Sequence, residues 1–361
     1  MDIRSRHRSD GSTRWLRYER DALGAGSRFL ILLGALVVFT DLTSCRSVGP
    51  ATRVSNDASA SATISEGPAL PFGCSSHAGG VIHGRIVIAG GTTWNLERTH
   101  KTFLDDTLVY EEGRWTPGPA LPAPLAEGAF AADGAVLYLV GGLSSPDQPT
   151  NIACKISQID QRLVTEKLPS LPFPTSAGGA AIQDGKLYLA CGYLDGKPSN
   201  QFWSLDISTP NGQWTPLASL PGPARAYPAM VASGSDLFLL GGLGGGDATV
   251  HDRTFGDAYR YIPASNQWTR LKDLPMAGYC WSACPLNGGR LLLAGRADRQ
   301  IHNEIWSVDL DTLDFQLLGH AVIQATCAPL VPLNGQTFWL IGGEPDSLKH
   351  RTNRVSMISL H

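Results

Sequence analysis

Short apolar stretches recur along the chain, and each ends at a pair of glycines or at a degraded copy of one. Leu137–Val140 runs into Gly141-Gly142, and Leu237–Leu240 runs into Gly241-Gly242. The stretches are four or five residues long and lie between turn-forming residues such as Asp184-Gly185-Lys186. Runs of this length and setting predict buried β-strands rather than helices.

The glycine pairs return at a nearly fixed interval. Their first members lie 51, 50, 50, 53 and 48 residues apart, and the pairs are Gly90-Gly91, Gly141-Gly142, Cys191-Gly192, Gly241-Gly242, Ala294-Gly295 and Gly342-Gly343. Each repeat opens on Leu-Pro or a related dipeptide, and the fourth strand of a repeat closes on an aromatic such as Trp115. One glycine pair per unit of about 50 residues is typical of a kelch-type β-propeller. The sequence therefore predicts an all-β fold with six blades.

The two ends of the repeat region predict how the ring closes. Ile64 matches the spacing of Trp115, so it occupies a fourth-strand position with no preceding strands of its own. The chain stops after a third strand, Val355–Leu360. We expect the segment around Thr63-Ile64 to pair beside that strand, which would remove two open sheet edges. The propeller is predicted over residues 63–361.

The N-terminal segment predicts a location for the protein. An Arg-rich stretch precedes an apolar run, Phe29–Thr40, which is too short to span a bilayer as a helix. Leu42-Thr43-Ser44-Cys45 resembles a bacterial lipobox, so residues 1–44 are predicted to be a lipoprotein signal peptide and Cys45 the lipidated residue. An ordinary signal peptide with a chance cysteine remains the alternative. Residues 45–62 suit a flexible tether. We expect a lipid-anchored protein of the periplasm or cell envelope.

Charge and cysteine usage exclude several classes of partner. The formal net charge is −3, and residues 1–44 hold seven Arg against five acidic residues, so the remainder is more acidic still. No basic face appears, and a nucleic-acid partner is not expected. The cysteines after Cys45 lie in apolar contexts that favour buried thiols, although a compartment outside the cytoplasm would permit disulfides. The histidines show no ligand spacing with them, so neither a metal nor another cofactor is predicted.

The strand order of a propeller blade decides which loops meet. In an antiparallel four-stranded blade, the loop entering the innermost strand and the loop leaving the second strand emerge on one face. Residues of both loops should therefore surround one mouth of the central channel. The candidates on this face are Ser76, His77, Trp94, Asn95, Glu127, Ala177, Arg225, Tyr279, Trp281, Arg296, Asp298, Glu344 and Arg351. From spacing alone, a charged residue in this set is better explained as an exposed loop charge than as a catalytic group.

Four segments resemble one known family. Ile341–Glu344 followed by His350–Thr352 resembles the Gly-Glu…Arg-Thr segment of the bacterial sialic acid mutarotases, or N-acetylneuraminate epimerases, which are six-bladed kelch proteins of the periplasm. Gly90–Asn95 resembles their first long loop. Leu121–Gly128 is similar to their Leu-Pro-x-Pro-Leu-Ala-x-Gly segment, and Pro221–Arg225 to their Pro-Gly-x-x-Arg segment.

The resemblance implies a function and a site. Glu344 would be the catalytic acid and base, and Arg351 would bind the carboxylate of a sialic-acid-like sugar. Further substrate-binding residues would be Arg225, Glu127, Asn95, Tyr279 and Arg296. The Glu/Arg segment falls in the last repeat, which resembles the circularly permuted branch of the family. The linker between Glu344 and Arg351 is one residue longer than the family's, so Lys349 or Arg354 could take the place of Arg351.

Two readings of function follow. The first is a mutarotase that interconverts the anomers of a carboxylated sugar, with a small-molecule carbohydrate as its partner. The alternative is a non-enzymatic, cell-surface propeller that binds a glycan or a protein. Copper-radical oxidase chemistry, known on other kelch propellers, is disfavoured because the predicted mouth has no convincing cluster of Tyr, His and Cys ligands. The sequence leaves a homodimer open.

Overall fold

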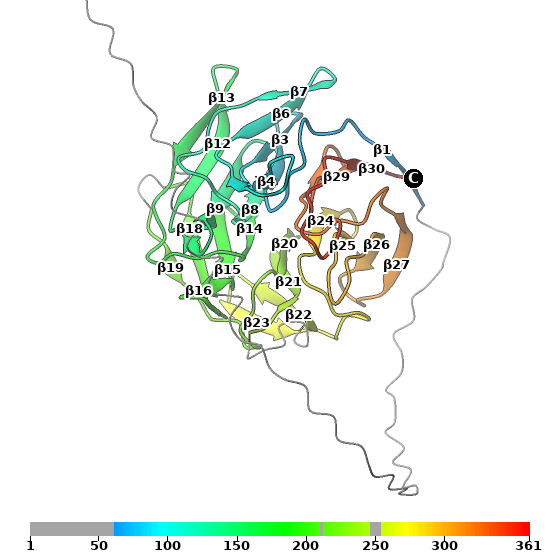
Figure 1. Ribbon diagram of the computed structural model, residues 1–361. Coiled ribbons are helices and arrows are strands. Elements are labelled where there is room, and N and C mark those ends of the chain that lie inside the picture. The colour runs from blue at the N-terminus through cyan, green and yellow to red at the C-terminus, as the bar shows by residue number, and fades with distance from the viewer. Residues whose placement is uncertain (1–60, 210–211, 246–253) are drawn as a thin grey trace, which may run out of the picture. The chain divides into compact units, whose positions relative to one another are not determined.

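Six four-stranded antiparallel sheets surround a central axis (Figure 1). The computed structural model describes residues 61–209, 212–245 and 254–361 of the 361-residue chain. In each blade the strand that opens the repeat lies innermost, and the innermost strands of neighbouring blades contact one another around the axis. The prediction of an all-β, six-bladed propeller is confirmed.

The first three blades follow directly in chain order. Blade 1 comprises Ala78–Ile82 (β2), Arg85–Ala89 (β3), Thr107–Glu111 (β6) and Arg114–Pro117 (β7). Blade 2 comprises Ala129–Ala132 (β8), Leu137–Val140 (β9), Ala153–Ile159 (β12) and Arg162–Lys167 (β13). Blade 3 comprises Gly179–Gln183 (β14), Lys186–Ala190 (β15), Phe202–Asp206 (β18) and Thr215–Pro216 (β19).

The other three blades complete the ring. Blade 4 comprises Ala229–Ser233 (β20), Asp236–Leu243 (β21), Thr254–Ile262 (β22) and Gln267–Arg270 (β23). Blade 5 comprises Ser282–Leu286 (β24), Arg290–Ala294 (β25), Glu304–Asp309 (β26) and Phe315–His320 (β27). Blade 6 comprises Leu330–Pro332 (β28), Thr337–Ile341 (β29), Val355–Leu360 (β30) and Ala62–Glu66 (β1).

Three loops that follow glycine pairs form small hairpins of their own. Their strands are Thr92–Trp94 (β4) with Lys101–Phe103 (β5), Leu143–Ser145 (β10) with Gln148–Pro149 (β11), and Tyr193–Leu194 (β16) with Lys197–Pro198 (β17). These hairpins stand on the face where the glycine pairs end their strands.

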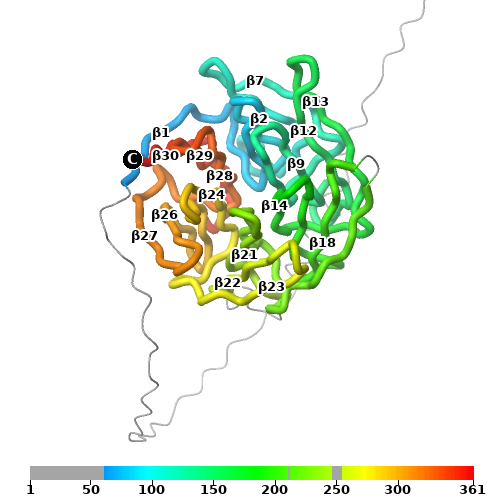
Figure 2. Tube along the Cα trace, turned by 180° about the vertical axis from the view of Figure 1, so that it is seen from behind, coloured from blue at the N-terminus to red at the C-terminus, as the bar shows by residue number. Residues whose placement is uncertain are grey.

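Ring closure joins the two ends of the described chain. β1 pairs antiparallel with β30, and Thr63 lies opposite Ser359 while Ile64 lies opposite Ile358. Figure 2 shows β1 beside β30 from behind. The Arg354 Nε donates to Glu66 Oε1 at 2.8 Å at one end of this pairing. The predicted pairing of the Thr63-Ile64 segment with the last strand is therefore confirmed.

The hydrophobic core lies between blades rather than at the axis. Each of six buried clusters in the described residues joins two adjacent blades; for example, Phe238 and Leu240 of blade 4 pack with Trp281 and Leu291 of blade 5. Strands such as β21 are buried along their whole length because a blade covers each face. This explains why the sequence shows continuous apolar runs instead of alternation.

Tryptophans of the outer strands also join neighbouring blades. The indole Nε1 of Trp115 donates to the carbonyl oxygen of Pro68 at 3.1 Å, that of Trp214 to Pro169 at 2.9 Å, and that of Trp268 to Ala218 at 2.7 Å. Each bond runs to the segment that leads out of the previous blade, so the repeated aromatic fixes the spacing between blades.

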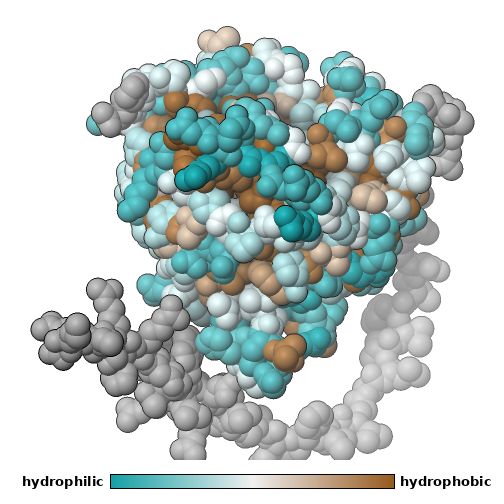
Figure 3. Space-filling view, turned by 90° about the horizontal axis from the view of Figure 1, so that it is seen from above, coloured by the Kyte–Doolittle hydropathy of each residue, from teal (hydrophilic) through white to brown (hydrophobic). Residues whose placement is uncertain are grey.

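The predicted signal peptide, Cys45 and all but the end of the predicted tether lie outside the described residues. Among the residues that are described, no helix is long and apolar enough to cross a membrane. In the view of Figure 3, hydrophilic residues cover much of the propeller surface, and hydrophobic residues are exposed between them.

Candidate active site at the channel mouth

Six residues, one from each blade, form a ring at one mouth of the channel. They are Ser76, Glu127, Ala177, Tyr227, Cys280 and Cys327, here called the mouth ring, and each has a left-handed φ between 51° and 58°. The backbone N–H of Glu127 donates to Ser76, and equivalent bonds of 2.7–3.0 Å run from Ala177, Tyr227 and Cys280 to the preceding ring residue. Ser76 N–H donates to Cys327 at 2.8 Å. Because every blade adopts the same turn, the ring side chains all reach the channel, where they line one cavity.

The residue before each ring position pairs with a residue that follows a glycine pair. In blade 6, Thr326 and Glu344 exchange backbone hydrogen bonds of 2.9 and 2.8 Å. Gly343 has a φ of 104°, and a Cβ there would lie 2.7 Å from the Thr326 carbonyl oxygen. The glycine is therefore required where these two loops cross. The predicted meeting of the two loop sets at one mouth is confirmed.

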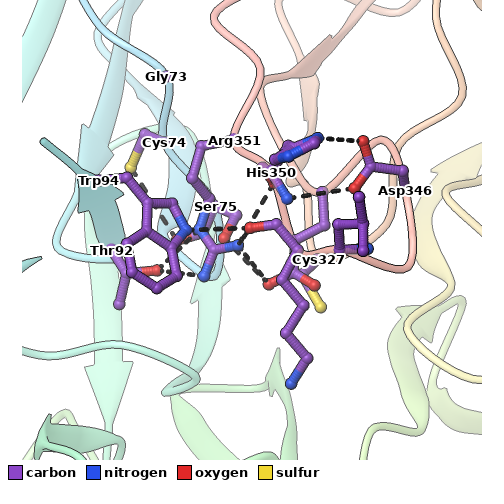
Figure 4. Close-up of polar contacts among 12 residues, drawn as sticks. Gly73, Cys74, Ser75, Thr92, Trp94, Cys327, Asp346, His350 and Arg351 are labelled. Carbon is purple, nitrogen blue, oxygen red and sulfur yellow. Dashed lines mark hydrogen bonds and ion pairs between the residues drawn. The ribbon is translucent and has the colours of Figure 1, made fainter. Parts of the chain in front are cut away.

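Glu344 and Arg351 come together on the wall of this mouth. The Arg351 Nη1 lies 3.0 Å from Glu344 Oε1, and the side chains are 3 % and 14 % exposed, respectively. Ser75 Oγ donates to the same carboxylate oxygen at 3.3 Å. The Arg351 Nε and Nη2 donate to Thr92 Oγ1 at 3.1 and 2.9 Å, so the guanidinium is fixed from blade 1 (Figure 4). This arrangement holds the Glu344 carboxylate beside a fixed positive charge.

The linker between Glu344 and Arg351 forms an ordered loop. Its carbonyl at Lys349 accepts hydrogen bonds from Trp94 Nε1, at 3.0 Å, and from Arg351 Nη1. Asp346 accepts the backbone N–H of Leu348 at 3.0 Å and contacts His350 Nδ1 at 2.5 Å (Figure 4). These contacts fix the backbone of Lys349, while its side chain is exposed and lines the mouth cavity.

A cavity of about 660 Å³ occupies the mouth, within the range of small-molecule sites. Its lining combines carboxylates and tyrosines with cations and amides. The lining includes Glu127, Tyr193, Tyr227, Tyr279, Asp298, Arg299, Gln300, Gln324, Glu344 and Lys349. A smaller cavity of about 110 Å³, lined by the mouth ring, adjoins it and shares Glu127, Tyr227, Cys280 and Cys327 with it.

A second carboxylate faces the same space as Glu344. Tyr227 Oη donates to Glu127 Oε2 at 2.5 Å. Burial and the Glu127 charge raise the pKa of Tyr227 well above its usual value, and burial raises the pKa of Tyr279 to about 12. Both phenols therefore stay protonated and can donate hydrogen bonds. Burial, together with the charges of Arg351 and Lys349, lowers the pKa of the neighbouring Lys101.

Arg225 does not reach the cavity that the sequence predicted for it. The residue is fully buried, and its Nη1 and Nη2 bind Asp257 Oδ1 and Oδ2 at 2.6 and 2.8 Å. Its Nη1 also donates to the Gly241 carbonyl at 2.9 Å, and its Nε to Pro223 at 3.1 Å. The physical reason is the position of Arg225 along the chain. Arg225 stands two residues before Tyr227, the ring residue of blade 4, and its side chain packs against Gly242 of the glycine pair. Its contacts hold blade 4 together.

Asn95 and Arg296 likewise lie outside the lining of the mouth cavity. Asn95 Oδ1 accepts the backbone N–H groups of Thr99 and His100 at 2.8 and 2.9 Å, which closes the tip of the β4–β5 hairpin. Arg296 is 8 % exposed, and its Nη1 binds Asp298 Oδ2 at 2.6 Å. Arg296 thereby holds a carboxylate that does line the cavity. Of the predicted substrate-binding residues, Glu127 and Tyr279 line the cavity, and Arg351 does not, although it contacts Glu344, which does.

Tyr227, Cys280 and Cys327 are site residues that the sequence-based prediction does not include. Each stands 14 or 15 residues before the first member of a glycine pair, as Ser76, Glu127 and Ala177 do. This spacing could have identified all six ring positions. The resemblance of Pro221–Arg225 to a family segment instead draws attention to Arg225, two residues before the ring residue Tyr227. Among the residues described, no group of three or more His, Cys, Asp or Glu side chains is placed to hold a metal ion.

Residues 168–326 match the sequence model of a family described as N-acetylneuraminate epimerase. The matched segment includes Tyr227, Tyr279 and Cys280 and ends before Glu344. Among curated relatives, the N-acetylneuraminate epimerase of Yersinia enterocolitica is 30% identical over 138 residues, which is 38% of this chain and 34% of that protein. Those of Haemophilus influenzae (strain PittEE) and Pasteurella multocida are each 28% identical, over 135 and 139 residues, or 37% and 38% of this chain and 35% of each relative.

The alignments therefore span about a third of the length of these relatives. The family match covers three of the six blades in part or in full, including the ring positions of blades 3, 4 and 5. Through this segment, the chain is similar to the N-acetylneuraminate epimerase family.

Proposed function

We propose that this propeller is a mutarotase that interconverts the α and β anomers of a sialic-acid-like, carboxylated sugar. The observation that carries the proposal is the Glu344 carboxylate, held by Arg351 on the wall of a mouth cavity of about 660 Å³. The family match supports the reaction class, because its members are named as N-acetylneuraminate epimerases. The position of the Glu/Arg segment in the last blade fits a circularly permuted branch, since permutation of a closed ring leaves the mouth unchanged.

Exchange of the anomers requires one ionisable side chain and a second group, such as a water, that passes on a proton. Anomers exchange through the open-chain sugar: a base removes the proton of the anomeric hydroxyl, and an acid protonates the ring oxygen as the ring C–O bond breaks. Glu344 would take the first proton, and a water or the Tyr227–Glu127 pair would supply the second. Proton transfer by a positioned side chain contributes about 10²–10⁴-fold to a rate. Closure of the ring from the opposite face then gives the other anomer.

The contacts favour different roles for the two cations of the loop. Arg351 uses its donors on Thr92, Glu344 and two backbone carbonyls, so we assign it to positioning Glu344. Lys349 lines the cavity with an exposed side chain. We assign the substrate carboxylate to its ammonium group, which forms charge-assisted hydrogen bonds of the required kind. Tyr279 and Glu127 would bind sugar hydroxyls.

Anomer exchange of N-acetylneuraminate, followed by NMR with and without the protein, tests this function. The protein should raise the exchange rate between the two anomers and leave their equilibrium ratio unchanged. Binding of the sugar without faster exchange would instead indicate the non-enzymatic, glycan-binding propeller. Comparison with a neutral hexose distinguishes recognition of the carboxylate from general sugar binding.

The location is a separate proposal. We propose that residues 1–44 are removed, that Cys45 is lipidated, and that residues 45–62 tether the propeller to a membrane facing the periplasm. Cys45→Ala should release the protein from the membrane fraction or block its processing. Unchanged membrane association of that variant would contradict the anchor.

A further inference from the structure

Two thiols stand side by side in the mouth ring. Cys280 of blade 5 and Cys327 of blade 6 are both free, and their Sγ atoms lie 3.3 Å apart. The other four described cysteines are buried: Cys74, Cys154, Cys191 and Cys284. Cys280 and Cys327 are partly exposed and line both the mouth cavity and the smaller cavity that adjoins it. A reagent that enters the mouth therefore meets this pair of sulfurs.

The backbone around the pair is already fixed. Cys280 N–H donates to Tyr227 at 3.0 Å, and the Cys327 carbonyl accepts the N–H of Ser76 at 2.8 Å. The two residues occupy equivalent ring positions, with φ angles of 55° and 51°. A disulfide needs its sulfurs about 2.05 Å apart. The two sulfurs lie 3.3 Å apart, so they must move closer for the bond to form.

We propose that Cys280 and Cys327 are a dithiol–disulfide site that cross-links blades 5 and 6 when a small disulfide compound enters the channel mouth. One thiol loses its proton and attacks a sulfur of the compound, which releases one thiol and leaves a mixed disulfide. The second cysteine then attacks the protein sulfur of that mixed disulfide and releases the second thiol. The protein dithiol loses two electrons and two protons, and the compound gains both as two thiols.

The surroundings of the pair raise the pKa of one of its thiols. The hydrogen bond with Cys280 and burial raise the pKa of Cys327 well above its usual value, and the charges of Glu344 and Glu127 raise it further. Either sulfur can be the donor in the contact between the two thiols, so either cysteine can make the first attack on the compound. The site is distinct in chemistry from sugar isomerisation and does not depend on the proposed function.

The cross-link has a consequence for the sugar site. Cys327 directly follows Thr326, whose backbone pairs with Glu344 through two hydrogen bonds. A bond from Cys327 to the neighbouring blade therefore restrains the loop that holds Glu344. The disulfide would join two cysteines that are 47 residues apart in the sequence and so would close a long loop. Such a loop raises the melting temperature of a protein of this size by roughly 6 °C.

The test uses the purified protein and 2-hydroxyethyl disulfide, a small neutral oxidant. The treated wild type should lose two hydrogens in intact mass, and peptide mapping should join Cys280 to Cys327. Dithiothreitol should reverse both the link and the rise in melting temperature. Cys327→Ser should instead retain a stable mixed disulfide on Cys280, because the second thiol is missing. Cys154→Ser, which removes a buried cysteine of blade 2, should behave as the wild type.

Peptide mapping of the linked cysteines shows whether the proposal holds. A wild type that accumulates mixed disulfides without the internal link would overturn it, as would a link that joins any other pair of cysteines. Absence of reaction in the wild type, at a concentration that oxidises an exposed dithiol peptide, would also overturn it.

Discussion

The Nη1 of Arg351 lies 3.0 Å from Oε1 of Glu344, seven residues earlier in the same loop. The same guanidinium donates to Thr92 Oγ1 in blade 1 through two other nitrogens. Arg351 therefore connects the carboxylate of the last blade to the first blade across the ring closure. An arginine held in this way fixes a neighbouring carboxylate and has little capacity left for a ligand.

Glu344→Gln should abolish most of the proposed catalysis. The amide keeps the shape of the side chain but cannot transfer protons, so the rate of protein-dependent anomer exchange should fall about 100-fold or more. The melting temperature should fall, because Arg351 loses its counter-charge, but less than in Arg351→Ala, since the amide oxygen can still accept from Ser75 and Arg351. Glu97→Gln, on the exposed tip of the β4–β5 hairpin, is the matched control. Equal rates for Glu344→Gln and wild type would shift the catalytic assignment to Glu127.

Arg351→Ala should lower stability as well as activity. Removal of the guanidinium leaves a largely buried carboxylate without its cation and takes two hydrogen bonds from Thr92. The free energy of unfolding should fall by about 3 kcal/mol, measured by denaturant titration. Arg114→Ala, in the exposed part of β7, should change it by less than about 0.5 kcal/mol. A fully stable Arg351→Ala that has merely lost affinity would instead restore Arg351 as the carboxylate receptor.

Lys349→Met should weaken recognition of the substrate carboxylate. Loss of one charged hydrogen bond costs about 1.5–3 kcal/mol, so KM for N-acetylneuraminate should rise roughly tenfold or more. The methyl ester of the same sugar lacks the carboxylate charge, and the variant and wild type should handle it alike. Lys186→Met, at the exposed start of β15, is the matched control. An equal loss on both substrates would show that Lys349 acts elsewhere.

Asp257→Asn should change how stability depends on pH. Burial alone would raise the pKa of Asp257, but the hydrogen bonds and charge of Arg225 outweigh it and lower the pKa below its ordinary value of 3.8. The stabilisation is therefore fully present above that ordinary value and is lost as the pH falls toward the lowered one. Melting curves should show a wild type that is more stable than the variant near pH 7, with the gap narrowing below about pH 4. Asp184→Asn, in an exposed turn, is the matched control for the substitution itself.

Ile64→Asp should weaken the ring closure. Ile64 packs in the cluster between blades 5 and 6, and its Cδ1 lies 2.4 Å from where a Cβ on Gly319 would stand. A charge at this position should lower the free energy of unfolding by about 2 kcal/mol and leave β30 prone to edge-to-edge association. Ser65→Asp, on the exposed side of the same strand, is the control. Thermal melts and size-exclusion chromatography measure the two effects; identical behaviour of both variants would argue against a packed closure.

The period of the glycine pairs by itself determined much of this fold. The interval near 50 residues, the place of Ile64 in the repeat and the final strand Val355–Leu360 predicted six blades and the pairing of β1 with β30. These features are local and repeated. Each blade packs against its two neighbours in the same way, so residues of the same type recur at the same positions in each repeat. The glycines themselves are required where two loops cross too closely for a side chain.

Only the tertiary structure decided which side chains face the channel. Arg225 and Tyr227 are two residues apart, yet one is fully buried against Asp257 and the other donates to Glu127 in the cavity. Cys280 and Cys327 come together from different blades, as do Arg351 and Thr92. Such contacts depend on the rotation of one blade against the next and on the left-handed turn of each ring residue. A sequence specifies the order of residues along a blade, but the neighbours across the axis exist only once the ring is closed.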